Sequence, residues 1–425
     1  MTENNASINN YNNIKELLAN INWNFYQPLS FILDQLVPFD TRKHLPYPGT
    51  YVPEIPFTLI ELLTKPGAIV LDPFSGSGTT FFQALILDRQ PFATDICQVS
   101  IEYINSLFKV FNHSLNRKES IDNLKKIIFK YDPSVNYSEL IKDEYEYLDK
   151  MSLWYSKDTF NMLAFLFKEK KELTDETLKN LLHISLLSII KNLCSQDRGW
   201  GCIADNMLPK KEQIQNKNVF KNLLQKVNIL INDIQLRLPY LSNSYNLLYH
   251  ELSKKTVTFN GDVRECEALL PLTIDCIVTS PPYPNMTDYI TSQRLNYYYL
   301  NSDPDIEKFK ETGARFKRMR NNSNETYKQD MLSINLRLYE LLKADGYLCL
   351  ILPEFETHNE RDNIRKIIIE SIIENLSEIG FIKRNIYERI LPAMRRSNNQ
   401  KWASLKKEHI YLYQKPKDEI QRVSY

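Results

Sequence analysis

Two predicted turns of this chain contain closely spaced residues that are suited to binding or catalysis. The first is the segment VLDPFSGSGTT at 70–80. Gly76 and Gly78 stand close together in a chain with only 10 glycines among 425 residues. The pair therefore indicates a backbone conformation that other residues do not adopt. A glycine turn between a strand and a helix lets a ligand approach the backbone, and the helix N-terminus favours an anionic group. Asp95 would end the next strand, where an acidic side chain suits the hydroxyls of a ribose.

This first turn departs from two common nucleotide-binding motifs. A dinucleotide fingerprint would have a third glycine where Phe81 stands, and a P-loop would have a lysine that is absent here. Both departures count against dehydrogenases and nucleoside triphosphatases. The turn predicts a different nucleoside-bearing ligand, and a glycine turn without any ligand is the alternative.

The second turn is TSPPY at 279–283. Its two prolines stiffen the backbone and remove two N–H donors. The carbonyls and the Ser280 hydroxyl are then left as acceptors, which suit an exocyclic amine with its two N–H groups. Tyr283 offers a flat face that could stack on a base. Taken alone, a proline-stiffened loop with no ligand explains this segment equally well.

The elements that must position these turns alternate between strand and helix patterns. Short apolar runs typical of buried strands occur at 68–71, 92–94, 256–259, 276–279 and 347–352, and two more strands are expected at 381–390 and 409–414. Helical spacing occurs at 57–63, 79–85, 329–343 and 361–378, with a turn at 343–346. This alternation predicts an α/β fold with a Rossmann-like, doubly wound and mostly parallel sheet.

The pattern changes between the second and third strands. From 113 to 254 glycine nearly vanishes, and Leu, Ile, Lys, Glu and Asn recur at three- and four-residue spacing. We expect a helical insertion, interrupted by a loop at 195–206. The predicted organisation is an N-terminal arm with the first part of the α/β domain at 1–112, the insertion at 113–254, and the second part of the α/β domain at 255–425.

Composition narrows the class of protein. With 53 basic and 52 acidic residues, 43% hydrophobic and 25% charged residues, the chain has the balance of an ordinary folded protein. We therefore exclude extensive disorder. No apolar run reaches the ~18 residues that a membrane span needs, and the N-terminus lacks a secretory pattern, so we expect a cytoplasmic protein. Cysteines and histidines show no metal-ligand spacing, so no metal site is expected.

In this order the two turns resemble those of the amino-group DNA methyltransferases, which modify cytosine N4 or adenine N6. That family binds S-adenosylmethionine at a DPFxGSGTT-type loop and places a (D/N/S)PPY loop over the target base. The segment YPGTYVP at 47–53 is similar to the family's cofactor-covering segment, and Asp262 matches an acidic position that holds the adenine amine. The resemblance covers about 44–112 and 256–415.

The resemblance implies a methyltransferase sheet, the cofactor S-adenosyl-L-methionine and a set of site residues. The residues expected to bind the cofactor are Tyr51, Asp72, Phe74, Ser75, Gly76, Ser77, Gly78, Thr79, Asp95 and Asp262. The expected catalytic residues are Ser280, Pro281, Pro282 and Tyr283. In the family, SPPY goes with methylation of cytosine N4, which is therefore favoured. Adenine N6, an RNA base amine, and a catalytically silent DNA-binding module are the alternatives.

A mechanism follows from the chemistry of the amine, whose lone pair is conjugated with the ring. If Ser280 Oγ and the Pro281 carbonyl accept its two N–H groups, a tetrahedral nitrogen with a free lone pair is favoured. The base cannot be reached inside a duplex, so we expect it to be flipped out, with Tyr283 stacking on it. Asn285, Asp288 and Tyr289 follow closely and are candidates either to line the base pocket or to support it.

Double-stranded DNA is the expected partner, with a cognate restriction endonuclease as a candidate second partner in a restriction-modification system. Two basic runs are candidates for contacting phosphates. The first run, interrupted only by Glu311, consists of Lys308, Lys310, Arg315, Lys317, Arg318 and Arg320, and the second consists of Arg395, Arg396, Lys401, Lys406 and Lys407. A solvated charged face is the alternative for both runs.

The insertion is the natural place for sequence recognition. Its residues Gln196, Asp197, Arg198 and Trp200 are of types that read base edges or wedge a stack. A helical packing domain is the alternative. The insertion precedes Asp262, whereas the familiar classes of the family place their recognition region after that point.

Overall fold

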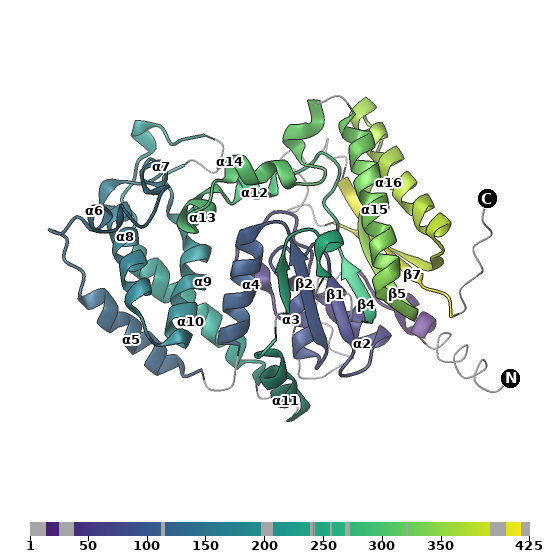
Figure 1. The fold of residues 1–425 in the computed structure, drawn as a ribbon, viewed down its shortest axis with the longest axis horizontal. Helices are drawn as coiled ribbons and strands as arrows, with labels where there is room; N and C mark the ends of the chain where they lie inside the picture. Colours follow the sequence, from purple (N-terminus) through teal and green to yellow (C-terminus); the bar gives the residue numbers. More distant parts are fainter. Residues whose placement is uncertain are drawn as a thin grey trace.

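The computed structural model describes residues 14–24, 38–111, 115–196, 207–238, 241, 243–255, 257–267, 273–319, 322–391 and 405–417. Within these residues the centre is a seven-stranded sheet with the order β3-β2-β1-β4-β5-β7-β6. Helices lie along both faces of the sheet, and a further group of helices extends from one end (Figure 1). The predicted Rossmann-like, doubly wound sheet is confirmed.

Five strands of the sheet are parallel. They are β1 (Ile69–Asp72), β2 (Gln90–Asp95), β3 (Thr258–Asn260), β4 (Ile274–Thr279) and β5 (Leu342–Phe355). After β1 the chain builds outward through β2 and β3, and it then returns to place β4 on the other side of β1. The order therefore reverses between β1 and β4, which is where ligands bind in sheets of this kind. Both turns predicted to do chemistry follow these two strands.

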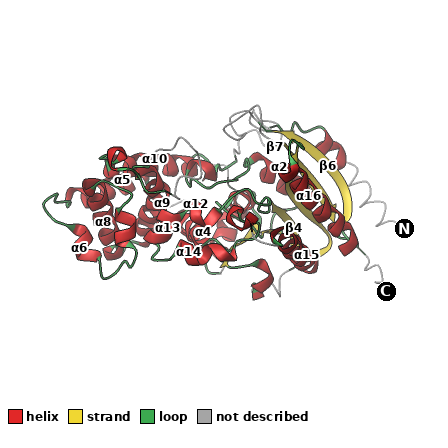
Figure 2. Ribbon diagram, turned by 90° about the horizontal axis from the view of Figure 1, so that it is seen from above, coloured by secondary structure: helices red, strands yellow, loops and turns green. Residues whose placement is uncertain are grey.

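The far edge of the sheet is an antiparallel pair of strands. Strand β7 (Leu405–Gln414) runs antiparallel to β5, and β6 (Ile382–Ile390) runs antiparallel to β7. Figure 2 shows β6 and β7 as long, curved ribbons beside α16. The turn expected at 343–346 lies instead inside β5. There Ile274 pairs with Leu342, but Cys276 pairs with Tyr347, so extra residues bulge out of β5 without ending it.

Alternate residues of the strands supply two separate cores. Val70 packs with α2 (Glu54–Leu63), α3 (Thr79–Ile86) and α4 (Gln98–Val110) on one face. Leu71 packs with the helices of the opposite face, which are α15 (Ser323–Leu341) and α16 (Glu360–Ile379). Because successive side chains of a strand point to opposite faces, continuous apolar runs serve both cores.

The segment between β2 and β3 is helical over its described residues. It contains α5 (Arg117–Phe129), α6 (Tyr137–Ile141), α7 (Leu148–Ser152), α8 (Lys157–Glu172), α9 (Glu176–Leu193), α10 (Val219–Gln235) and α11 (Asn243–Leu252). Helix α9 packs against α4, and the buried side chains of these helices form one continuous cluster with those of the sheet. The segment is therefore anchored through a shared core. The boundaries at 112/113 and 254/255 stay predictions.

Short helices join β4 to α15: α12 (Tyr289–Ser292), α13 (Arg294–Tyr299) and α14 (Pro304–Glu307), followed by single 3-10 turns at Lys308–Lys310 and Arg315–Met319. Other 3-10 turns lie at Thr41–Lys43, Lys211–Gln213 and Val263–Glu265. Figure 1 shows α12, α13 and α14 running from the sheet toward α7 and α9. Among the described helices, none is both long and apolar enough to cross a membrane.

Candidate active site

A cavity of about 830 Å³, including its open mouth, lies at the carboxyl ends of β1, β2, β3 and β4. Its walls come from segments that are far apart in the sequence. They are 47–51, 73–77 with Thr79, 95–97, 261–263, Ser280, Pro282, Tyr289, Ile290, Glu311 and Thr312. Most of the residues predicted to bind the cofactor are therefore brought together with the serine of the second turn.

The glycine loop presents backbone N–H groups to a buried carboxylate. Gly76 lies at φ +49° and Gly78 at φ +79°, both in the left-handed region. Asp95 accepts hydrogen bonds from the N–H of Gly76 at 2.7 Å and from that of Cys97 at 2.8 Å. Burial raises the pKa of Asp95 to about 6. The carboxylate thus holds the loop and keeps acceptor capacity facing the cavity.

Gly78 does not line the cavity. It precedes α3 as the N-cap, and a Cβ there would lie 2.8 Å from Ile104 Cγ1 on α4. The residue is glycine because the backbone is left-handed and because α4 approaches closely. Gly76 does line the cavity, and its Cβ would meet the ring of Tyr47 at 3.1 Å.

Asp72 lies beneath the loop, away from the cavity wall, and is 1% exposed. It accepts hydrogen bonds from Thr279 Oγ1 at 2.6 Å, from the Phe74 N–H at 3.1 Å and from the Tyr51 hydroxyl at 3.4 Å. Burial raises its pKa. Asp72 therefore ties the end of β1 to the end of β4, so that the two turns keep a fixed separation.

The second turn brings an acceptor to the cavity. Ser280 and Pro282 line the wall, whereas Pro281 and Tyr283 do not. The carbonyl of Pro282 is already used, because it accepts the Tyr327 hydroxyl at 2.7 Å. Ser280 Oγ lies 3.4 Å from the Tyr283 hydroxyl, which donates to Glu408 Oε1 at 2.9 Å. Burial raises the pKa of Tyr283 well above its usual value, so the phenol stays protonated.

The glycine loop and the acceptor-bearing proline loop thus meet in one cavity. Residues 28–113 match the family model described as DNA methylase. The chain is similar to the amino-group DNA methyltransferases over this segment, which contains the glycine loop and Asp95.

Three relatives of this chain carry type II methyltransferase names. M.MjaII of Methanocaldococcus jannaschii is 23% identical over 81% of this chain and 78% of its own length. M.BsoBI of Geobacillus stearothermophilus is 26% identical over 56% of this chain and 48% of its own length. M.MvaI of Kocuria varians is 25% identical over 69% of this chain and 64% of its own length. The similarity extends well beyond the segment that the family model matches.

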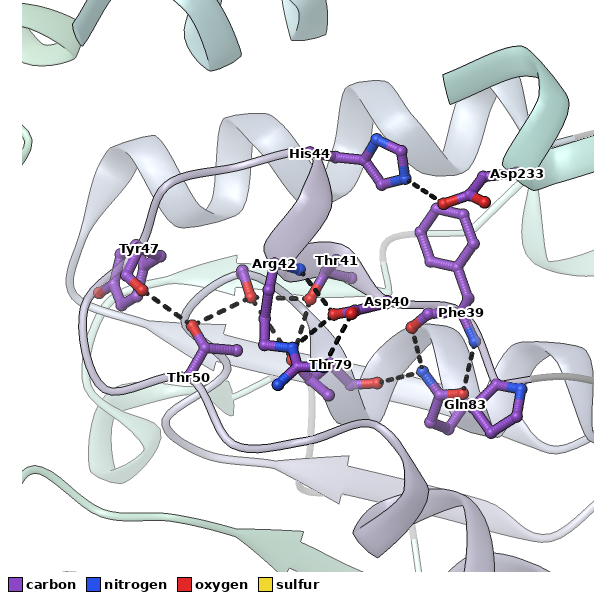
Figure 3. Close-up of polar contacts among 12 residues, drawn as sticks. Phe39, Asp40, Thr41, Arg42, His44, Tyr47, Thr50, Thr79, Gln83 and Asp233 are labelled. Atoms are coloured by element: carbon purple, nitrogen blue, oxygen red, sulfur yellow. Dashed lines mark hydrogen bonds and ion pairs between the residues drawn. The ribbon is translucent and has the colours of Figure 1, made fainter. Parts of the chain in front are cut away.

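The segment before α2 supplies residues 47–51 of the cavity wall, and Figure 3 shows its polar contacts with α3 and α10. Thr41 Oγ1 lies 2.9 Å from both Ser77 Oγ and Thr79 Oγ1. Gln83 receives the N–H of Phe39 at 3.0 Å and donates to its carbonyl at 2.8 Å. Sequence reasoning missed these contacts, because single threonines and glutamines have no recognisable spacing.

The same segment contacts the helical insertion and the region after the second turn. His44 Nε2 lies 2.8 Å from Asp233 Oδ2 on α10. The ring of Tyr47 stacks on that of Tyr289, with centroids 5.9 Å apart and planes at 21°. The cofactor-covering segment predicted at 47–53 is therefore held from both sides.

Asp262 lines the cavity beside Gly261. Its carboxylate accepts hydrogen bonds from the N–H of Arg264 at 2.9 Å and from its guanidinium at 2.9 and 2.7 Å. A carboxylate has about four acceptor positions, so Asp262 can still receive one more donor from the cavity.

Glu311 is a cavity residue that sequence reasoning missed, because it appeared only as an interruption of a basic run. It is 2% exposed and accepts the N–H groups of Tyr289 at 2.8 Å and Ile290 at 3.0 Å. Burial raises the pKa of Glu311 to about 8. Its isolation among cations was the one signal available in the sequence.

Two of the residues predicted to contact phosphates, Arg315 and Lys317, lie among the described side chains. Lys317 Nζ donates to the carbonyls of Phe309 at 2.8 Å and Glu311 at 2.6 Å, so it holds its own loop together. Arg315 is half-buried at the start of a 3-10 turn. Outside the described side chains lie Arg318, Arg320, Arg395, Arg396, Asp197, Arg198 and Trp200.

One group of metal-ligand types gathers outside the cavity. Ligand atoms of Glu354, Glu388 and His409 lie within 4.8 Å of one another on β5, β6 and β7. Both glutamates are exposed, and Glu388 also pairs with Lys407 at 2.8 Å. The group shares no residue with the cavity wall.

Proposed function

We propose that this chain uses S-adenosyl-L-methionine to methylate the exocyclic amine of a flipped base in double-stranded DNA, with cytosine N4 as the favoured target. The observation that carries the proposal is the meeting of the glycine loop and Ser280 in one cavity at the strand switch point. The type II methyltransferase names of the relatives support DNA as the substrate and a cognate restriction endonuclease as a partner.

The cavity residues fit the chemistry of this cofactor. Asp95 can accept the ribose hydroxyls, because its two backbone donors leave part of its acceptor capacity free. Asp262 can accept the adenine amine. Gly76 leaves the backbone open to a ligand, and Tyr51, Phe74, Ser75, Ser77 and Thr79 complete this wall. When bound, the cofactor supplies an electrophilic methyl group on a sulfonium.

Ser280 would then act as acceptor toward the substrate amine. Accepting an N–H favours a tetrahedral nitrogen whose lone pair is free, and it stabilises the positive charge that develops on nitrogen. The Pro281 carbonyl is the proposed acceptor of the second N–H. Holding the nitrogen in line with the sulfonium methyl supplies the proximity contribution. The amine proton leaves to solvent after transfer, so no separate base is required.

The target base is the finer part of the proposal. SPPY favours cytosine N4, because in the resembling family the serine form goes with cytosine and the aspartate form with adenine. Adenine N6 stays the second candidate. In either case the base must leave the duplex, since the amine is otherwise engaged in pairing.

The test is methyl transfer from tritiated S-adenosylmethionine to duplex DNA, with mass spectrometry of the released nucleosides. We expect N4-methylcytosine from the wild type and a loss of about 10²- to 10³-fold for Ser280→Ala, as for removal of one transition-state hydrogen bond. Ser253→Ala is the control, because Ser253 is exposed and its hydroxyl donates to the nearby His250 carbonyl at 2.8 Å.

Each outcome of this test has a distinct meaning. Label on adenine would keep the reaction and refute the choice of cytosine. Label on transfer RNA in a parallel assay, with none on DNA, would replace the substrate. No label on any acceptor, together with no cofactor binding by calorimetry, would favour a catalytically silent DNA-binding module.

A further inference from the structure

A chain of four polar side chains runs from the far edge of the sheet to the cavity. Arg389 on β6 donates to Glu408 Oε2 on β7 at 2.8 Å. The Tyr283 hydroxyl donates to Glu408 Oε1 at 2.9 Å, and Ser280 Oγ lies 3.4 Å from the Tyr283 oxygen. Arg389 is 1% exposed and Glu408 is 8% exposed. The glutamate lies 125 residues from the tyrosine that it holds.

The charges at the far end fix the direction of every hydrogen bond in this chain. A guanidinium can only donate, and the carboxylate paired with it can only accept. The hydroxyl of Tyr283 must therefore donate to Glu408, which leaves its oxygen as an acceptor. The hydroxyl of Ser280 can then donate to Tyr283. The lone pairs of Ser280 are left for a group in the cavity.

The direction of these hydrogen bonds matters because a serine hydroxyl at this position could either donate to the substrate amine or accept from it. An aspartate in the same turn would be an acceptor by virtue of its charge, whereas a serine hydroxyl can donate or accept. A serine that donated to the substrate nitrogen would occupy the lone pair that has to attack the methyl group. An arrangement that consumes the hydroxyl proton elsewhere removes this competing orientation.

We propose that Glu408 is a positioning residue which, through Tyr283, makes Ser280 a hydrogen-bond acceptor toward the substrate amine. Arg389 supports it by holding the carboxylate in place. The inference rests on the proposed function, since an amine substrate is what requires an acceptor. The hydroxyl tether also fixes the ring plane of Tyr283 next to the catalytic turn.

The alternative is that the ion pair only stabilises the edge of the sheet. A buried ion pair is often no more stabilising than well-packed apolar residues. Here one carboxylate oxygen serves the ion pair and the other serves the catalytic turn. A purely structural pair has no need of the second contact.

The experiment is a double-mutant cycle of Tyr283→Phe and Glu408→Gln in the full-length protein, with steady-state methylation of duplex DNA. Both changes keep the shape of the side chain, and thermal unfolding establishes that each variant is folded. We expect each single variant to lose about tenfold or more in kcat, with KM for the cofactor unchanged, as for loss of a charge-assisted hydrogen bond. The double variant should lose little more than the worse single variant, because both act through one chain.

The matched control is Glu388→Gln. Glu388 pairs with Lys407 at 2.8 Å across the same two strands, but it is exposed and makes no contact with the catalytic turn. Its kcat should equal that of the wild type. Losses that multiply in the double variant would overturn the inference in favour of two independent structural effects.

The outcomes separate this inference from the proposed function. A wild-type protein that transfers no methyl group would refute both. An active wild type with Tyr283→Phe and Glu408→Gln variants of unchanged kcat would refute only the role of Glu408. A folded Glu408→Gln variant whose loss lies in KM for the cofactor would also refute it.

Discussion

The two turns that meet in the cavity are built in opposite ways. The loop after β1 is shaped by left-handed glycines, and Asp95, 19 residues from Gly76, holds it by accepting the Gly76 N–H. The loop after β4 uses prolines, which have no N–H to present, and its tyrosine is held by Glu408 on β7, two strands away from β4 in the sheet. One loop is therefore a local construction of the backbone, and the other depends on distant side chains.

This difference matches what each loop would have to bind. Backbone donors and a buried carboxylate suit a ligand that carries both anionic and hydroxyl groups. Side-chain and carbonyl acceptors suit an amine. A local loop is disturbed mainly through backbone conformation, whereas a loop held from a distance is disturbed by changes in remote elements.

The largest expected effect is on the backbone of the first loop. Gly78→Ala forces a Cβ to 2.8 Å from Ile104 at a left-handed φ, so we expect a loss of about 2–4 kcal/mol in the free energy of unfolding. Gly67→Ala is the control, because Gly67 has a similar φ of +84° with nothing within 4 Å. It should lose only about 1 kcal/mol. Urea denaturation measures both, and equal losses would contradict a role for the contact with α4.

The next effect concerns the tie between the two loops. Thr279→Val removes the donor at 2.6 Å from buried Asp72, and we expect a loss of about 2 kcal/mol at pH 7. Since that hydrogen bond lowers the pKa of Asp72, its removal raises this pKa further, so the loss should shrink toward pH 4.

Thr258→Val is the control for this tie. Thr258 donates at 2.7 Å to the neutral side chain of Asn105, and about 1 kcal/mol is expected without the same pH dependence. Denaturation of both variants at pH 4 and pH 7 is the measurement. If Thr279→Val lost the same free energy of unfolding at pH 4 and pH 7, the hydrogen bond from Thr279 would not stabilise the ionised form of Asp72.

The first loop should respond to pH through Asp95. Its folded pKa of about 6 lies above its ordinary value of 3.8, so the folded state retains a proton that the unfolded state has lost. The stability of the free protein should therefore fall as pH rises from 4 to 6. Cofactor affinity should change in the other direction. It should weaken by about tenfold per pH unit below 6, because protonation removes the acceptor for the ribose.

Calorimetry from pH 5 to 7.5 measures this affinity. In Asp95→Asn the pH dependence of the affinity should disappear, and the stability should lose the part of its pH dependence that Asp95 contributes. An affinity that stays flat across this range in the wild type would refute the assignment of Asp95 to the ribose.

The smallest expected effect concerns the contact between the segment before α2 and the region that follows the second loop. Tyr289→Leu removes the ring that stacks on Tyr47 at 5.9 Å, and we expect cofactor affinity to fall by about threefold, as for loss of one aromatic pair. Tyr289→Phe keeps the ring and should bind like the wild type. A larger loss in Tyr289→Phe than in Tyr289→Leu would mean that the hydroxyl, not the stacking, matters.

The periodicity of the sequence predicted most of the sheet and both turns. Strands at 68–71, 92–94 and 276–279 coincide with β1, β2 and β4, because short apolar runs bounded by Pro, Gly and Asp are local signals. Lys-Ala-Asp-Gly at 343–346 has turn composition, and Asp345 lies at φ +62°, but the chain pairs with β4 on both sides of this segment, so it bulges out of β5 without ending the strand. Of the cavity residues, those inside the two motifs were found and Glu311 was missed, as was Thr41, which supports the wall through Ser77 and Thr79.

Local residue patterns already specify where strands end, where glycine allows a left-handed backbone, and where proline removes donors. Which distant polar groups meet depends on how the strands pair in the sheet. Glu408 reaches Tyr283 because β7 joins the sheet beside β5, and Arg389 reaches Glu408 because β6 pairs with β7. The physical reason is that a buried polar group must find a partner wherever the fold places one. Such pairing leaves no periodic trace in the residues between.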